Sequence, residues 1–360
     1  MLNRAVTTGI SVLSAASLFG QSPAPKASPS PTPSPSPTPT NEEIINSLGQ
    51  ADLQAAISLL KSNFTNPEAI TDTELNRATL EGLLVRMPGG LLLLPAKENA
   101  TVEPAVPFYS EIFENHIGYL RLGLLDSGNL KELDKKLSEF NAKKIDALIV
   151  DLRASSTGDF ATAAEFGKRF CPKGKALFSI RKAGAKSDRA FTSDRDPAFS
   201  GLLVVLTDAD TAGGAEALAA MLRADDKALI IGQSTAGRAV EYSDSPLPSG
   251  KILRVASSEA VMPDGQPLFP GGVKPDLPVE MSLADKRQIF HQSDKGMSQF
   301  VYETDRPHLN EAALIAGTNP ELDIPDAQRR NRARDKQPPR DSVLQRALDV
   351  VTSLEIYQKR

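Results

Sequence analysis

The chain has 360 residues, enough to bury a sizeable core and to form two or three folding units. Its net charge of −4 and its 24% of charged residues describe an ordinary soluble surface and argue against a nucleic-acid-binding protein. Cys171 is the only cysteine, which excludes an internal disulfide framework and a multi-cysteine zinc site. With only three histidines besides, the sequence offers few metal ligands, and we expect neither a metal nor another cofactor.

Residues 1–20 have the pattern of a secretory signal peptide. Arg4 precedes a mildly apolar stretch from Ala5 to Phe19, and the segment ends in small residues around Ala15, Ala16, Ser17 and Gly20. The stretch is too short and too rich in Ser and Thr to span a bilayer permanently. We therefore expect an exported protein, either secreted or held in the periplasm or cell envelope, without a stable transmembrane segment. A disordered start on a cytosolic protein is the alternative.

A tract rich in Pro, Ser and Thr follows over residues 21–40, and its composition predicts a disordered linker of extended geometry. Residues 41–105 then predict a small helical subdomain. Apolar residues recur at helical spacing over Asn41–Ser62, and a capping box that begins at Thr71 starts a second helix ending near Met87. The Pro-Gly-Gly sequence at 88–90 ends that helix.

Short apolar runs and helical patterns alternate over residues 106–285, which predicts an α/β core with a mixed, largely buried sheet and flanking helices. The predicted strands are Ile117–Leu122, Ala147–Leu152, Ala176–Ile180, Leu202–Leu206 and Leu229–Ile231. The predicted helices are Asn129–Asn141, Ala161–Phe170 and Gly213–Arg223.

The remainder of the chain is more polar. Residues 286–340 predict a polar extension that ends in a basic linker over 326–340, which we interpret as solvated rather than as a nucleic-acid patch. Residues 341–360 predict a C-terminal helix. Its amphipathic part, Ser342–Ile356, is capped by Asp341 or Ser342 and is expected to pack back on the body.

Four motifs occur in a fixed order between His116 and Glu280. They are Ile117-Gly-Tyr-Leu-Arg-Leu122, Ile149-Val-Asp-Leu-Arg153 with Gly158, Thr211-Ala-Gly-Gly-Ala-Glu216, and Met262-Pro-Asp-Gly265 followed by Gly272-Val-Lys-Pro-Asp276. Together they resemble the C-terminal processing, or tail-specific, serine peptidase family. The resemblance implies a core of the crotonase and Clp-protease type and a peptide or unfolded polypeptide as ligand. The family's usual peptide-binding PDZ module has no room between Pro88 and Pro107.

In this family a serine nucleophile and a lysine base lie 25 positions apart. The matching positions here are Gly213 and Arg238, also 25 apart. Glycine has no hydroxyl to attack a peptide carbonyl, and a guanidinium stays protonated where the family's lysine must become neutral. Both halves of the dyad are therefore disabled, although Thr211 and Ser234 offer hydroxyls nearby as possible relocated nucleophiles.

Other residues of the motifs predict a binding surface. The amides of Gly214 and of Thr157 or Gly158 match the family's oxyanion donors and would suit a carboxylate or carbonyl, while Glu216 could orient a neighbour. A structural interpretation, in which the glycines serve close packing at a helix start, competes with this one. Asp151 and Arg153 are expected to form a buried pair at a strand end.

Three functions remain open. The first is a non-catalytic, exported family member that binds peptide, unfolded polypeptide or an envelope protein through the degenerate groove. The second is an active serine endopeptidase that processes polypeptide C-termini with a relocated nucleophile. The third is an unrelated enzyme on the same fold that uses the oxyanion site on an acyl substrate, which no acyl-carrier or nucleotide motif supports.

Overall fold

The computed structural model describes residues 40–95, 106–156, 159–224, 228–301 and 339–358. The expected signal peptide, almost all of the linker at 21–40 and most of the basic segment at 326–340 fall outside these ranges, as do Thr157 and Gly158. The chain divides into two compact units, Met1–Glu74 and Leu75–Arg360. None of the helices in the described ranges has the length and apolar character needed to cross a membrane.

The first unit is helical. Its elements are α1 (Asn41–Ser47), α2 (Gln50–Asn63) and η1 (Pro67–Ala69), and α3 (Asp72–Arg86) begins at its end. The single helix predicted over 41–62 is in fact two, because the chain becomes extended at Leu48 and Gly49. Gly49 then starts α2, where its N–H donates to Asp52 at 3.1 Å.

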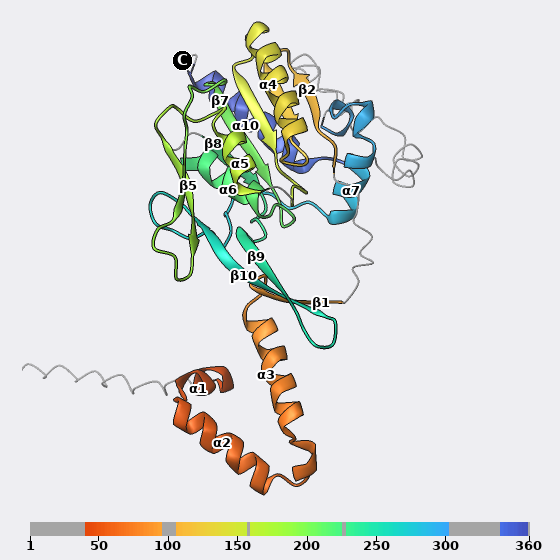
Figure 1. Ribbon diagram of the computed structural model, residues 1–360. Helices are drawn as coiled ribbons and strands as arrows, with labels where there is room; N and C mark the ends of the chain where they lie inside the picture. Colours follow the sequence, from red (N-terminus) through yellow and green to blue (C-terminus); the bar gives the residue numbers. More distant parts are fainter. Residues whose placement is uncertain (1–39, 96–105, 157–158, 225–227, 302–338, 359–360) are drawn as a thin grey trace, which may run out of the picture. The chain divides into compact units, whose positions relative to one another are not determined.

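The second unit is built around a six-stranded sheet with the order β11-β8-β7-β4-β3-β2 (Figure 1). The pair β2–β3 is antiparallel and the remaining pairs are parallel. The strands are β2 (Tyr109–Phe113), β3 (Ile117–Arg121), β4 (Ala147–Asp151), β7 (Leu202–Thr207), β8 (Ala228–Gly232) and β11 (Leu277–Pro278). The predicted α/β alternation and mixed sheet are confirmed.

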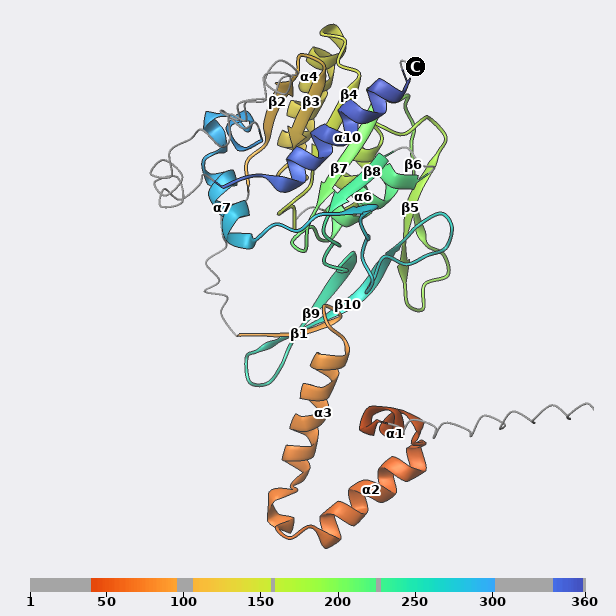
Figure 2. The ribbon, with the colours of Figure 1, turned by 180° about the vertical axis from the view of Figure 1, so that it is seen from behind.

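Helices cover both faces of this sheet because its strands alternate apolar side chains between two cores. On β4, Leu148 and Val150 enter one core, whereas Ala147 and Ile149 enter the other. The first face carries α4 (Ser127–Ala142), α5 (Phe160–Gly167) and α6 (Gly214–Arg223), and the second carries α10 (Ser342–Gln358) and, towards one edge, α7 (Leu283–His291) (Figures 1 and 2). Two short 3-10 turns, η3 (Ser293–Lys295) and η4 (Ser298–Phe300), follow α7.

A second sheet of five strands was not predicted as a separate layer. It has the order β1-β10-β5-β6, and β9 also pairs with β10. The strands are β1 (Leu91–Leu94), β5 (Ala176–Lys182), β6 (Arg189–Thr192), β9 (Val240–Pro246) and β10 (Ile252–Val261). The prediction of a wholly helical segment over 41–105 is therefore wrong at β1, because the four leucines pair with β10. The predicted strand at 176–180 exists but belongs to this second sheet.

The parallel strands β4, β7 and β8 end at the same edge of the six-stranded sheet. In open α/β sheets, ligands bind outside the carboxyl ends of the strands, where the connecting loops meet. Three loops meet at this edge here, namely 152–156 after β4, 208–213 after β7 and 233–238 after β8. These loops carry the residues that the sequence motifs single out.

Candidate functional site

The first of the two dyad positions, Gly213, lies at the turn between β7 and α6. Its backbone has φ 62° and ψ −125°, a conformation that residues with a Cβ adopt only under strain. A Cβ built at this position would meet no atom within 4 Å. The turn therefore has space for a side chain although the residue present has none. We call Gly213, Arg238 and the two loops that carry them, 208–213 and 233–238, the dyad site.

Glu216 links the two halves of the dyad site. One carboxylate oxygen, Oε2, accepts the N–H of Gly213 at 3.1 Å and the N–H of Arg238 at 2.7 Å. The other, Oε1, accepts the N–H of Gly237 at 2.6 Å and the hydroxyl of Thr235 at 2.5 Å. Because both dyad positions donate to one oxygen atom, their backbones lie side by side. The 25-residue spacing in the sequence thus corresponds to adjacency in the fold.

The Glu216 side chain is fully buried. Burial raises the pKa of its carboxyl, and the four hydrogen bonds it accepts oppose that shift only in part. The sequence motifs predict Glu216 as a residue of the binding surface. All of the contacts given above are made inside the chain, so in this conformation its carboxylate positions the dyad site instead of facing a ligand.

Arg238 has an exposed side chain. Its Cγ lies 3.0 Å from the place that a Cβ on Gly89 would occupy, so the stem of the side chain packs on the turn before β1. The same turn is held by Tyr242, whose hydroxyl donates to the Gly89 carbonyl at 2.7 Å. A guanidinium here is a permanent cation with a fork of N–H donors and has no capacity to act as a base.

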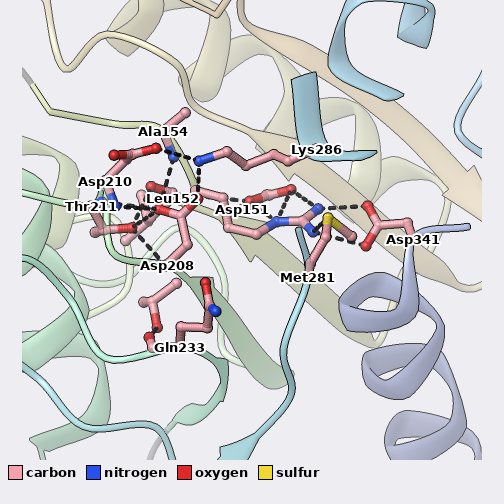
Figure 3. Close-up of polar contacts among 12 residues, drawn as sticks. Asp151, Leu152, Ala154, Asp208, Asp210, Thr211, Gln233, Met281, Lys286 and Asp341 are labelled. Carbon is pink, nitrogen blue, oxygen red and sulfur yellow. Dashed lines mark hydrogen bonds and ion pairs between the residues drawn. The ribbon is translucent and has the colours of Figure 1, made fainter. Parts of the chain in front are cut away.

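The two hydroxyls considered as relocated nucleophiles have different surroundings. Thr211 is fully buried, and its hydroxyl donates to the Leu152 carbonyl at 2.9 Å (Figure 3). Ser234 is exposed on the loop after β8. The structure therefore keeps Thr211 away from any substrate in this conformation and leaves Ser234 accessible. Gly214, the predicted amide donor, is buried as the first residue of α6.

Hydrogen bonds connect the loop after β4 to the dyad site. Ala154 has φ 60° and donates its N–H to Asp208 Oδ1 at 3.2 Å (Figure 3). The carbonyl oxygen of Ser155 accepts the N–H of Ala212 at 3.0 Å, and the Ser155 hydroxyl donates to the Gly123 carbonyl at 2.9 Å. This loop leads directly into Thr157 and Gly158, the predicted oxyanion donors.

A buried ionic cluster lies behind these loops, next to a cavity of about 260 Å³ lined in part by Arg153, Asp208 and Lys286. Lys286 Nζ is 2.5 Å from Asp208 Oδ2 and 2.6 Å from Asp210 Oδ2 (Figure 3). Arg153 makes paired contacts to Asp341, at 2.8 and 2.7 Å.

The expected pair of Asp151 and Arg153 is present, and the structure extends it. Arg153 Nη2 lies 2.6 Å from Asp151 Oδ2, which also accepts the Tyr119 hydroxyl at 2.7 Å. Burial alone would raise the pKa of Asp151, but the charge and hydrogen bonds of Arg153 and the hydrogen bond from Tyr119 hold it below its usual value. Asp341 also accepts the N–H of Leu344, so the carboxylate that pairs with Arg153 also caps α10.

Sequence reasoning missed Asp208, Lys286 and Asp341 as partners of the site. The first of these directly follows β7, and acidic residues at strand ends were a usable signal. Lys286 lies on α7 without any motif around it, and its proximity to Asp208 depends on how that helix packs. Its role could be found only from the fold.

The arrangement limits the chemistry of the dyad site. Position 213 carries no hydroxyl, and position 238 carries a guanidinium, which stays protonated. A Cβ at Gly213 would have open space around it, and the backbone of Gly213 lies next to that of Arg238, whose side chain is an exposed cation. Such a site is suited to a ligand with carbonyl or carboxylate oxygens.

Comparison with protein families finds the model of peptidase family S41 matched over residues 116–279. The carboxyl-terminal-processing protease of Synechocystis is 25% identical over 178 residues, which cover 49% of this chain and 41% of that protein. The carboxy-terminal processing protease CtpA of Bacillus subtilis is 25% identical over 179 residues, covering 49% of this chain and 38% of that protein. The matched part thus spans about two fifths of the length of these relatives.

Among solved structures, a peptidase-like protein from Parabacteroides merdae superposes with a TM-score of 0.50 and 17% identity, covering 67% of this chain and 85% of the other. A likeness at this identity bears on the fold alone. It agrees with the mixed sheet and flanking helices described above.

Proposed function

Because the chain belongs to peptidase family S41, we propose that it is an exported, non-catalytic member of that family. In this proposal the dyad site binds peptide, unfolded polypeptide or a partner protein of the cell envelope without cutting it. The part of the chain that matches the family contains the dyad site and the sheet that carries it.

One observation carries the proposal. Glu216 holds the backbones of Gly213 and Arg238 together on one oxygen, yet both side chains that the chemistry needs are replaced. If the loops were displaced, the match of the two positions to the family dyad would mean little. Since they are adjacent, the loss of the hydroxyl and of the neutral amine supports loss of catalysis.

The remaining features support binding. The open volume at Gly213 leaves room for a main-chain carbonyl or carboxylate of an extended polypeptide, and the Arg238 guanidinium offers donors and charge to such an oxygen. An Arg is favoured over a Lys for this task, because its planar fork forms two parallel hydrogen bonds. Export is supported by the composition of residues 1–20 and of the linker at 21–40.

The alternative is an active serine-type endopeptidase with a relocated nucleophile. The exposure of Ser234 on the loop beside Arg238 favours it, whereas the burial of Thr211 argues against that residue. The Ser234 hydroxyl would also need a base, and none of the contacts described above supplies one.

Proteolysis of an unfolded reporter protein tests the proposal. Four forms of the chain are compared: wild type, Gly213→Ser/Arg238→Lys, Ser234→Ala, and the Ser234→Ala change added to the double variant. We expect wild type and Ser234→Ala to be equally inert and to bind the reporter saturably. Cutting by the double variant, with or without Ser234, would show that only the dyad was missing. Cutting by wild type that disappears in Ser234→Ala would overturn the proposal in favour of the endopeptidase.

A further inference from the structure

We propose that Lys286 is a positioning residue for the dyad site, which it acts on through Asp208. Lys286 holds the Asp208 carboxylate in place, and this carboxylate fixes the loops 152–156 and 208–213 in the arrangement that ligand binding requires. The consequence for ligand binding rests on the proposed function, whereas the loop network itself does not. Lys286 lies on α7, beyond residue 279, where the match to the family ends.

The contacts of Lys286 are those of a buried ion pair. Its side chain is 9% exposed and that of Asp208 is 7% exposed, and Nζ lies 2.5 Å from Oδ2 of Asp208. Asp210 provides a second carboxylate at 2.6 Å, but its side chain is 53% exposed. Burying a carboxylate costs free energy unless a cation or several hydrogen-bond donors compensate it.

The other oxygen of Asp208 holds the two loops. Oδ1 accepts the N–H of Ala154 at 3.2 Å, and that residue has a positive φ of 60°, a conformation that non-glycine residues hold only when their surroundings impose it. Oδ1 also accepts the N–H of Thr211 at 3.0 Å. One carboxylate group therefore connects the loop after β4, the loop after β7 and helix α7 (Figure 3).

Backbone hydrogen bonds carry this connection into the dyad site. The Thr211 carbonyl accepts the N–H of Ala236 at 2.9 Å, which fixes the loop after β8. Ala212, the residue before Gly213, donates its N–H to the Ser155 carbonyl at 3.0 Å. A displacement of the Asp208 carboxylate would thus loosen donors and acceptors within two residues of each dyad position.

The other charged groups near Asp208 are already paired. Arg153, which lines the same cavity, is held by Asp151 on β4 and by Asp341 at the start of α10. Asp210 contributes negative charge only. Among the residues that the structure describes, Lys286 is thus the cation bonded to Asp208. Replacing it by Met keeps the length of the side chain and removes the positive charge, which leaves the buried Asp208 carboxylate without its cation.

Nuclear magnetic resonance of the amides of Ala154 and Thr211 tests the network without any ligand. In the full chain, we expect the hydrogen exchange of both amides to report one common free energy of opening, because one carboxylate oxygen accepts both N–H groups. In Lys286→Met both amides should exchange faster, whereas they should be unchanged in Lys295→Met, which removes an exposed cation after α7. Different free energies of opening in wild type, or equal behaviour of the two variants, would overturn the inference.

Binding of a fluorescent unfolded peptide adds the functional consequence. We expect Lys286→Met to bind about tenfold more weakly than wild type at a temperature where both are folded, and Lys286→Arg, which keeps the cation, to bind nearly as tightly as wild type. A residue that only stabilises the fold would lower the melting temperature without changing the affinity of the folded protein. Unchanged binding in Lys286→Met would overturn the inference. If wild type binds no peptide, the proposed function fails, and the amide measurements decide the Lys286 network separately. If Lys286→Met does not fold, the common free energy of opening in wild type remains the decisive result.

Discussion

The two sides of one sheet edge differ in what their polar groups do. On the α6 side, the dyad site presents an exposed Arg238 and an empty volume at Gly213. On the α7 and α10 side, Lys286 and Arg153 are buried and bonded to carboxylates. The buried side chains fix the backbone, whereas the loss of catalytic side chains that we propose concerns the exposed side. The difference teaches that the geometry of a family site can be maintained by residues other than the reactive ones.

The largest effect is expected on the buried side, from Asp341→Ala. The change leaves Arg153 without its paired partner and removes the cap of α10, so we expect a loss of about 3–5 kcal/mol in the free energy of unfolding. Urea unfolding measures it. Asp349→Ala, which removes an exposed carboxylate from the same helix, is the control and should cost less than about 0.5 kcal/mol. Equal losses would mean that the cluster does not hold α10.

Glu216→Gln should have the next largest effect, and it acts on the dyad side. Glu216 accepts four hydrogen bonds, and the amide nitrogen of Gln is a donor that would face two of these four donor groups. We therefore expect a loss of about 3 kcal/mol in the free energy of unfolding. Glu132→Gln on the exposed face of α4 serves as the matched control. A loss no greater than the control's would show that the two dyad positions do not depend on this carboxylate for their adjacency.

Gly213→Ala tests whether the turn before α6 is strained. A Cβ fits the open volume but must adopt φ near 62°, which should cost about 1–2 kcal/mol of stability. Gly271→Ala is the control, because a Cβ there also meets nothing within 4 Å and its φ is not positive. If both variants were equally stable, the strained conformation at 213 would be ruled out.

Much of this comparison could be predicted from the sequence, and the rest depends on packing. Apolar runs alternating with helical patterns predicted β3, β4, β7 and β8, because buried parallel strands are uniformly apolar. The resemblance to the family implied that Gly213 and Arg238 occupy the two dyad positions, and Glu216 links their backbones. The second sheet was missed, since β9 and β10 mix polar and apolar residues without clear alternation.

The buried ionic side was the least predictable part. The pair of Asp151 and Arg153 is local in sequence, so it could be expected, but Asp341 lies 188 positions from Arg153. Lys286 and Asp208 are 78 positions apart and share no motif. Such contacts are set by the docking of α7 and α10 on the sheet, which hydrophobic periodicity does not specify.

The smallest expected effect is on how the free energy of unfolding depends on pH. The sign of this dependence differs between the two sides. The lowered pKa of Asp151 means that its contribution to stability is present above its ordinary value of 3.8 and is lost as the pH falls through the lowered value. The raised pKa of Glu216 has the opposite effect on stability. The contribution of Glu216 to stability is present below its ordinary pKa of 4.5 and is lost as the pH rises through the raised value. The stability difference between wild type and Glu216→Gln, measured by urea unfolding from pH 4 to pH 7, should therefore be larger at the acid end. A difference that grows towards neutral pH would mean that hydrogen bonding to the charged carboxylate outweighs its burial, so that the dyad side would be held by charge in the same way as the side of Asp151.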